Sequence, residues 1–161
     1  MVHRKLFLII QLLLAFQFSY GQHSSKKNTI VGTWRIVEFS SLDSSTGQWV
    51  HPFGKNPKGY FIYTKNNIVN INVCSEFPLK ISEDSSKNYT INLFNHIWHN
   101  SFGYFGTYSI DSKNSVVTHH VEGGSIPYYI EKDKKRAFNI KGDTLTIGDN
   151  KTWKRDLVRV E

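Results

Sequence analysis

The sequence predicts an all-β domain, either a sandwich or a barrel, of about nine short strands. Stretches rich in β-branched and aromatic residues recur about every 8–12 residues, separated by Gly, Asn, Asp and Ser. The 161 residues include 11 Phe, 8 Tyr and 4 Trp, residue types that favour strands. Cys74 is the only cysteine. An intramolecular disulfide is therefore excluded, and a hydrophobic core must hold the domain together.

The first 21 residues have the layout of a cleaved secretory signal peptide. Arg4 and Lys5 precede an apolar run over residues 6–18, and Ser19-Tyr20-Gly21 places small residues at the −3 and −1 positions of a cut before Gln22. The run is shorter than the ~20 residues of a permanent transmembrane helix. An uncleaved membrane anchor is the alternative. We expect a secreted or periplasmic protein with no stable membrane anchor.

The rest of the chain reads as one domain. Residues 22–29 are small and polar, which is typical of a flexible leader, and residues 30–161 form the expected barrel domain. The formal net charge is +7, and two of the basic residues belong to the signal segment, which leaves +5. These charges are dispersed along the chain rather than clustered among exposed aromatic residues. The pattern therefore does not favour nucleic-acid binding.

The expected strands follow one another along the domain with short turns between them. Asn66 and Asn67 tolerate the positive φ of a tight hairpin loop, Gly123-Gly124 interrupts the chain, and Gly142 lies in a further turn. A short extended piece covers residues 49–53. Strands are expected over residues 31–39, 59–64, 68–74, 102–110, 115–122, 127–130, 136–140, 144–147 and 152–160.

One segment shows a different periodicity. Tyr89, Leu93 and Ile97 are spaced four residues apart, as on one face of a helix. Asn and Thr, which form helices poorly, are frequent around them. We expect one short helix between about residues 86 and 99.

Five motifs in a fixed order resemble the bacterial and fungal lipocalin-like domain family. They are Gly32-Thr33-Trp34, Gly59-Tyr60-Phe61-Ile62-Tyr63-Thr64, Tyr104-Phe105-Gly106-Thr107-Tyr108, Thr118-His119-His120-Val121-Glu122-Gly123, and Arg136-x-Phe138 before Gly142-Asp143-x-Leu145-Thr146. The resemblance spans residues 31–160. It implies a closed antiparallel, calycin-type β-barrel of 8–9 strands with one short helix.

The resemblance also implies that the Gly-x-Trp strand seals one end of the barrel, which would bury Trp34. Residues 88–100 depart from the family pattern, because they lack its acidic, alanine-rich helix. The cavity entrance is therefore expected to differ here. The resemblance supports the fold more strongly than it supports a function.

Alternation along the expected strand 115–122 suggests which side chains face the interior. Val117, His119 and Val121 form the more apolar face, so His119 is expected inside and His120 outside or at the rim. A register slip of one residue would exchange the two. Neighbouring histidines point to opposite faces and cannot share a metal ion. His119 could equally be a core histidine bonded to Tyr or backbone groups.

Arg136 shares a strand face with Phe138 and Ile140. If that face lines the interior, the guanidinium needs a partner, because an unpaired buried charge costs several kcal/mol. Glu38, Glu122 or a ligand carboxylate could supply it, and an exposed arginine at the end of a lysine-rich turn is the alternative. Together with Tyr108 and His119, Arg136 would then contact the polar head of a ligand.

The apolar body of such a ligand would lie against aromatic side chains. The candidate ligand-binding residues are Trp34, Tyr63, Tyr104, Tyr108, His119, His120, Glu122 and Arg136. No metal or cofactor is expected. His96 and His99 have ligand spacing but lack a third ligand, and the chain contains neither Gly-x-Ser-x-Gly nor His-Glu-x-x-His.

Three functions are compatible with these patterns. The first is binding of a small hydrophobic molecule, including one with an acidic head group, in the barrel interior. The second is a cofactor-free cyclase or isomerase that uses the same cavity. The third is a barrel filled by its own side chains, with an envelope structural or protein-interaction role.

Overall fold

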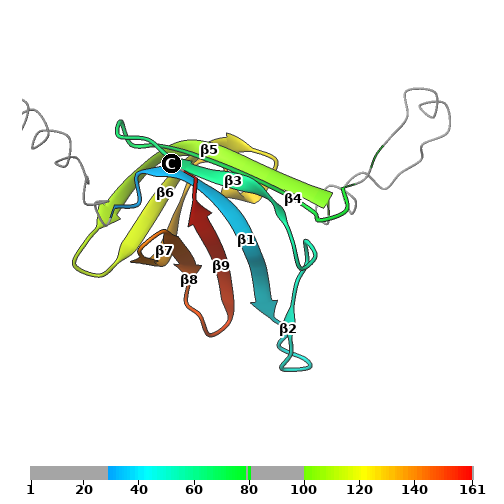
Figure 1. Cartoon of the computed structure of the whole chain (residues 1–161). Helices are drawn as coiled ribbons and strands as arrows, with labels where there is room; N and C mark the ends of the chain where they lie inside the picture. Colours follow the sequence, from blue (N-terminus) through cyan, green and yellow to red (C-terminus); the bar gives the residue numbers. More distant parts are fainter. Residues whose placement is uncertain (1–28, 79, 81–99, 161) are drawn as a thin grey trace, which may run out of the picture.

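The computed structural model describes residues 29–78, 80 and 100–160. Figure 1 shows that this part of the chain forms a strongly curved, closed sheet. Its elements are β1 (Gly32–Leu42), β2 (Trp49–Val50), β3 (Lys58–Tyr63), β4 (Ile68–Cys74), β5 (Ser101–Asp111), β6 (Val116–Gly124), the 3-10 helix η3 (Pro127–Tyr129), β7 (Lys132–Lys141), β8 (Thr144–Gly148) and β9 (Trp153–Arg159).

Each long strand pairs antiparallel with its neighbours, in the order β1, β3, β4, β5, β6, β7, β8, β9. The sheet closes because β1 pairs with β9 on its other edge, where Trp34 lies opposite Arg159 and Ser41 opposite Trp153. β2 adds two residues to the end of β1. The described part of the chain is thus an eight-stranded antiparallel barrel with one extra short strand, as the sequence predicts.

The prediction for residues 127–130 is wrong. The sequence predicts a strand, whereas the structure has the 3-10 helix η3 from Pro127 to Tyr129. Proline fixes its own φ near the helical value and cannot donate to a strand ladder, so a turn is the favoured structure at this point. The following strand begins at Lys132, earlier than expected, and the lysine-rich segment belongs to it. The helix expected over residues 86–99 lies outside the described residues.

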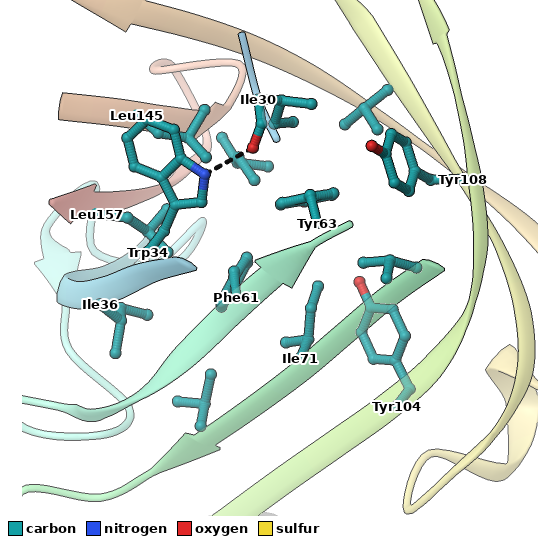
Figure 2. Packing of buried hydrophobic residues seen from close by; sticks show 14 of the residues in the cluster. Ile30, Trp34, Ile36, Phe61, Tyr63, Ile71, Tyr104, Tyr108, Leu145 and Leu157 are labelled. Carbon is teal, nitrogen blue, oxygen red and sulfur yellow. Dashed lines mark hydrogen bonds between the residues drawn. The ribbon is translucent and has the colours of Figure 1, made fainter. Parts of the chain in front are cut away.

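One end of the barrel is closed by Trp34, as expected from the Gly-x-Trp motif. Its side chain is fully buried, and its indole Nε1 donates a 2.7 Å hydrogen bond to the carbonyl oxygen of Ile30 (Figure 2). The Arg159 guanidinium lies over the indole at 4.0 Å and donates to the carbonyls of Thr29 and Val31. The segment before β1 is thereby held across this end.

A continuous apolar core extends from this closed end into the barrel, where side chains alternate between the inside and the outside of each strand. On β4, Val69, Ile71 and Val73 are buried while the residues between them are exposed. Leu145 and Leu157 close the core beside Trp34 (Figure 2). In the described residues, no helix is long and apolar enough to span a bilayer.

Candidate functional site

A cavity of about 930 Å³ occupies the end of the barrel away from Trp34. Its wall includes the last part of β1, the first parts of β5 and β9 and the segment around η3, and β3, β4, β6, β7 and β8 each add one residue. Most of the wall is apolar. The lining residues are Phe39, Ser41, Pro52, Phe53, Phe61, Ile71, Phe102, Tyr104, His119, Ile126, Tyr128, Tyr129, Arg136, Ile147, Thr152, Trp153 and Arg155.

Three phenylalanines form one side of the cavity. The rings of Phe39, Phe53 and Phe102 meet edge to face, with centroid separations of 4.7, 5.7 and 5.4 Å. This arrangement lets each electropositive ring edge meet the face of a neighbouring ring. The result is a preformed aromatic wall against which a planar or aliphatic molecule can lie.

Two arginines supply the positive charge of the wall. Arg136 comes from β7 and Arg155 from β9, and their guanidinium carbons lie 5.5 and 5.1 Å from the ring centroid of Trp153. Arg155 donates to the carbonyls of Ser40 and Lys154, and Arg136 to the carbonyl of Lys135. Burial and, to a smaller extent, the nearby positive charge of Arg136 together lower the pKa of Arg155 to about 10. The Arg155 guanidinium therefore stays cationic at neutral pH.

His119 lies at the inner end of the cavity between two tyrosines. Its Nε2 shares a 2.9 Å hydrogen bond with the Tyr63 hydroxyl, and its Nδ1 shares a 2.8 Å bond with the Tyr104 hydroxyl. Burial lowers the pKa of His119 to about 3, with smaller contributions from the positive charges of Arg136 and His120. The imidazole is therefore neutral at physiological pH, and burial raises the pKa of both tyrosines.

The structure brings together three of the eight predicted site residues. Tyr104, His119 and Arg136 all line the cavity. His119 faces inward with only 1% of its surface exposed, and the inner face of β7 carries Arg136, Phe138 and Ile140. The alternation arguments for these two strands are confirmed.

The other five predicted residues are not among those that line this cavity. Trp34 and Tyr63 are buried behind it in the core. The Tyr108 hydroxyl donates to the Thr64 carbonyl at the far end of the β3–β4 hairpin, so it does not join His119 and Arg136. His120 and Glu122 project from the outer face of β6, with Glu122 exposed.

Neither carboxylate proposed as a partner for Arg136 reaches it. Glu38 forms an ion pair with Lys154 at 2.8 Å, and Glu122 faces outward. Among the described residues, the cavity lining contains no aspartate or glutamate. The Arg136 guanidinium instead lies 5.7 Å from the Tyr129 ring centroid and donates a 3.5 Å bond to the Tyr129 hydroxyl.

Arg155 and Trp153 are among the cavity residues that sequence reasoning missed. The signal was present, because Trp153, Arg155 and Leu157 alternate along the last strand and Leu157 is fully buried. Period-two alternation would have placed Arg155 on the inner face.

Three polar side chains form hydrogen bonds with one another on the outer surface of the barrel. The Ser109 Oγ lies 3.0 Å from His120 Nε2, and His120 Nδ1 lies 2.6 Å from Asp133 Oδ1. This is the order of contacts found in serine hydrolases. The His120 and Asp133 side chains are 41% and 60% exposed, whereas such chemistry relies on a water-excluded site with aligned oxyanion donors. We therefore interpret the three residues as a hydrogen-bonded link across β5, β6 and β7.

No group of three or more His, Cys, Asp or Glu side chains able to hold a metal ion occurs within residues 29–78, 80 and 100–160. The lone cysteine, Cys74, is a free thiol at the end of β4 and is half-buried.

These features define a closed β-barrel with an aromatic, positively charged interior cavity at one end. The family model of the lipocalin-like domain matches residues 31–157, and the chain belongs to that family. A comparison with curated proteins finds no match.

Proposed function

We propose that this protein binds a small, predominantly hydrophobic molecule in the barrel interior. The observation that carries this proposal is the cavity of about 930 Å³, lined mainly by Phe, Ile and Tyr side chains. Its size lies within the ~300–1,000 Å³ range of small-molecule pockets, and a few directed polar groups in an apolar lining are typical of such sites. Membership of the lipocalin-like family agrees with this role.

Two features favour binding over the other functions that the sequence allows. Within the described part of the chain, a cavity of this size argues against a barrel filled by its own side chains. A cyclase or isomerase would need a general base poised near the working pH. His119 is a poor base, because its pKa is lowered to about 3 and both of its ring nitrogens already share hydrogen bonds with tyrosines.

The N-terminal segment leads us to propose export as well. Residues 1–21 would be removed, and the domain would act outside the cytoplasm or in the periplasm. Mass spectrometry of the N-terminal peptide of protein from culture medium or periplasm should place the first residue near Gln22, as glutamine or as its cyclised pyroglutamate form. Retention of residues 6–18 in the exported protein would contradict cleavage.

Titration with the neutral fluorescent probe N-phenyl-1-naphthylamine tests the binding function. We expect saturable binding at one site, and Ser41→Trp should weaken it, because Ser41 lines the cavity and an indole would occupy part of the volume. Asn139→Trp is the control, since Asn139 is exposed on the outer face of β7. Equal affinities in all three proteins, or no binding, would overturn the proposal.

A further inference from the structure

The positive charge in the cavity has no protein counter-ion in the described part of the chain. Arg136 and Arg155 contact carbonyl oxygens, the Tyr129 hydroxyl and aromatic rings, and the described lining contains no carboxylate. Like charges close together in a half-buried site repel one another, and the lowered pKa of Arg155 reflects its burial and the nearby charge of Arg136. An anion between the two guanidinium groups would relieve this repulsion.

Tyr63, His119 and Tyr104 are joined by hydrogen bonds, and the direction of these bonds determines whether the Tyr104 hydroxyl can donate into the cavity near the two arginines. In the described part of the chain, His119 Nε2 is the only hydrogen-bond partner of the fully buried Tyr63 hydroxyl. An unsatisfied buried donor costs about 1–3 kcal/mol, so Tyr63 donates to Nε2, and the neutral imidazole carries its proton on Nδ1. His119 therefore donates to the Tyr104 oxygen.

The Tyr104 oxygen accepts this bond from His119 Nδ1. Burial raises the pKa of Tyr104, and the nearby positive charge of Arg136 acts in the opposite direction. The O–H of Tyr104 itself has no acceptor within this chain of contacts, and Tyr104 lines the cavity beside Arg136. The hydroxyl is thus oriented as a donor toward the cavity, next to the two guanidinium groups.

We propose that Arg136, Arg155 and the Tyr104 hydroxyl form the binding site for the carboxylate of an amphiphilic acid whose apolar tail lies against Phe39, Phe53 and Phe102. A planar carboxylate suits the donor fork of a guanidinium. The phenylalanine wall adjoins the charged group directly, because the Arg155 guanidinium lies over the Phe39 ring. This inference rests on the proposed binding of a hydrophobic molecule in the cavity.

Titration with cis-parinaric acid and its methyl ester tests the inference, because the two probes share a fluorescent tail and differ in the charge of the head. We expect the unsubstituted protein to bind the acid at least about tenfold more tightly than the ester. Arg136→Met and Arg155→Met should each weaken acid binding by about 10- to 100-fold, the range for a hydrogen bond to a charged group. Tyr104→Phe should lower acid affinity less, and ester affinity should stay within about twofold in all three variants.

Lys135→Met is the matched control. Lys135 is exposed on β7 directly beside Arg136 and faces outward, so this variant loses the same charge without altering the cavity. Acid affinity should be unchanged in it. If Lys135→Met and Arg136→Met lose acid affinity equally, the loss reflects the net charge of the protein and not a site in the cavity, and the inference is overturned.

The outcomes separate the inference from the proposed function. Equal affinity for acid and ester in the unsubstituted protein overturns the carboxylate site and leaves the binding function intact. Binding of neither probe overturns both. If one arginine variant also loses ester binding, the cavity of that variant has collapsed. The other arginine variant and Tyr104→Phe then decide the inference, and both must still lose affinity for the acid but not for the ester.

Discussion

The guanidinium carbon of Arg155 lies 3.2 Å from the ring centroid of Phe39. The same side chain donates hydrogen bonds of 2.6 and 2.7 Å to the carbonyl oxygens of Ser40 and Lys154. One planar group therefore covers an aromatic ring and joins β9 to β1 beside the cavity. Arginine can make both contacts at once because its donors lie in the plane of the group that stacks.

Arg155→Lys should destabilise the protein although it keeps the positive charge. A lysine ammonium cannot stack as a plane and cannot reproduce the donor fork, so we expect the free energy of unfolding to fall by about 1–2 kcal/mol. Urea unfolding measures this change. Lys135→Arg, on the exposed face of β7, should leave the midpoint unaltered. An unchanged midpoint in Arg155→Lys would show that charge alone is needed at this position.

Trp34→Ala should weaken the closed end of the barrel. The substitution empties a fully buried site and removes the indole donor to Ile30, so the free energy of unfolding should fall by ~3–5 kcal/mol. Trp49 is 40% exposed, and Trp49→Ala should change it by about 0.5 kcal/mol or less. Equal thermal unfolding of the Trp34→Ala and unsubstituted proteins would refute the sealing role.

His119 should make stability depend on pH. Its pKa is about 3 in the folded protein and about 6.5 when unfolded. Above pH 6.5 the imidazole is neutral in both states, and its contribution to stability is complete. As the pH falls from about 6.5 toward 3, the unfolded state takes up a proton that the folded state does not. The free energy of unfolding then decreases by up to ~1.4 kcal/mol per pH unit.

His119→Gln isolates this effect, because glutamine keeps hydrogen-bonding groups but does not titrate. Urea unfolding between about pH 7 and pH 4 should show a shallower decline in the variant than in the unsubstituted protein. Other groups titrate in both proteins, so only the difference between the two curves reports on His119. Parallel curves would mean that the pKa of His119 is not depressed in the fold.

Local patterns predicted most of the barrel. β4 begins and ends at the expected residues, because alternating Val and Ile side chains between turn residues mark its bounds. The inward placement of His119 followed from the apolar neighbours on its face of β6. Pro127 was misread, since an apolar run with aromatic residues favours a strand even where proline favours a turn.

The candidate site was predicted less completely, because it depends on contacts between distant strands. Sequence patterns place Tyr104 and Tyr108 on the same face of β5, and the structure agrees. They do not show that the Tyr108 hydroxyl reaches the Thr64 carbonyl while the Tyr104 hydroxyl reaches His119. These partners depend on which end of the barrel each tyrosine occupies, and therefore on the register of β5 against β4 and β6.

Photolabelling tests the central claim, that a hydrophobic molecule binds inside the barrel, most directly. β3 offers an internal reference, because Phe61 lines the cavity while its neighbours Tyr60 and Ile62 are exposed on the outer face. A fatty acid carrying a diazirine in its tail would be bound, irradiated and located by tandem mass spectrometry. The predicted result is label on Phe61, Phe39 and Phe102, competed away by unlabelled fatty acid. Label confined to outward residues such as Tyr60 and Ile62 would contradict the claim.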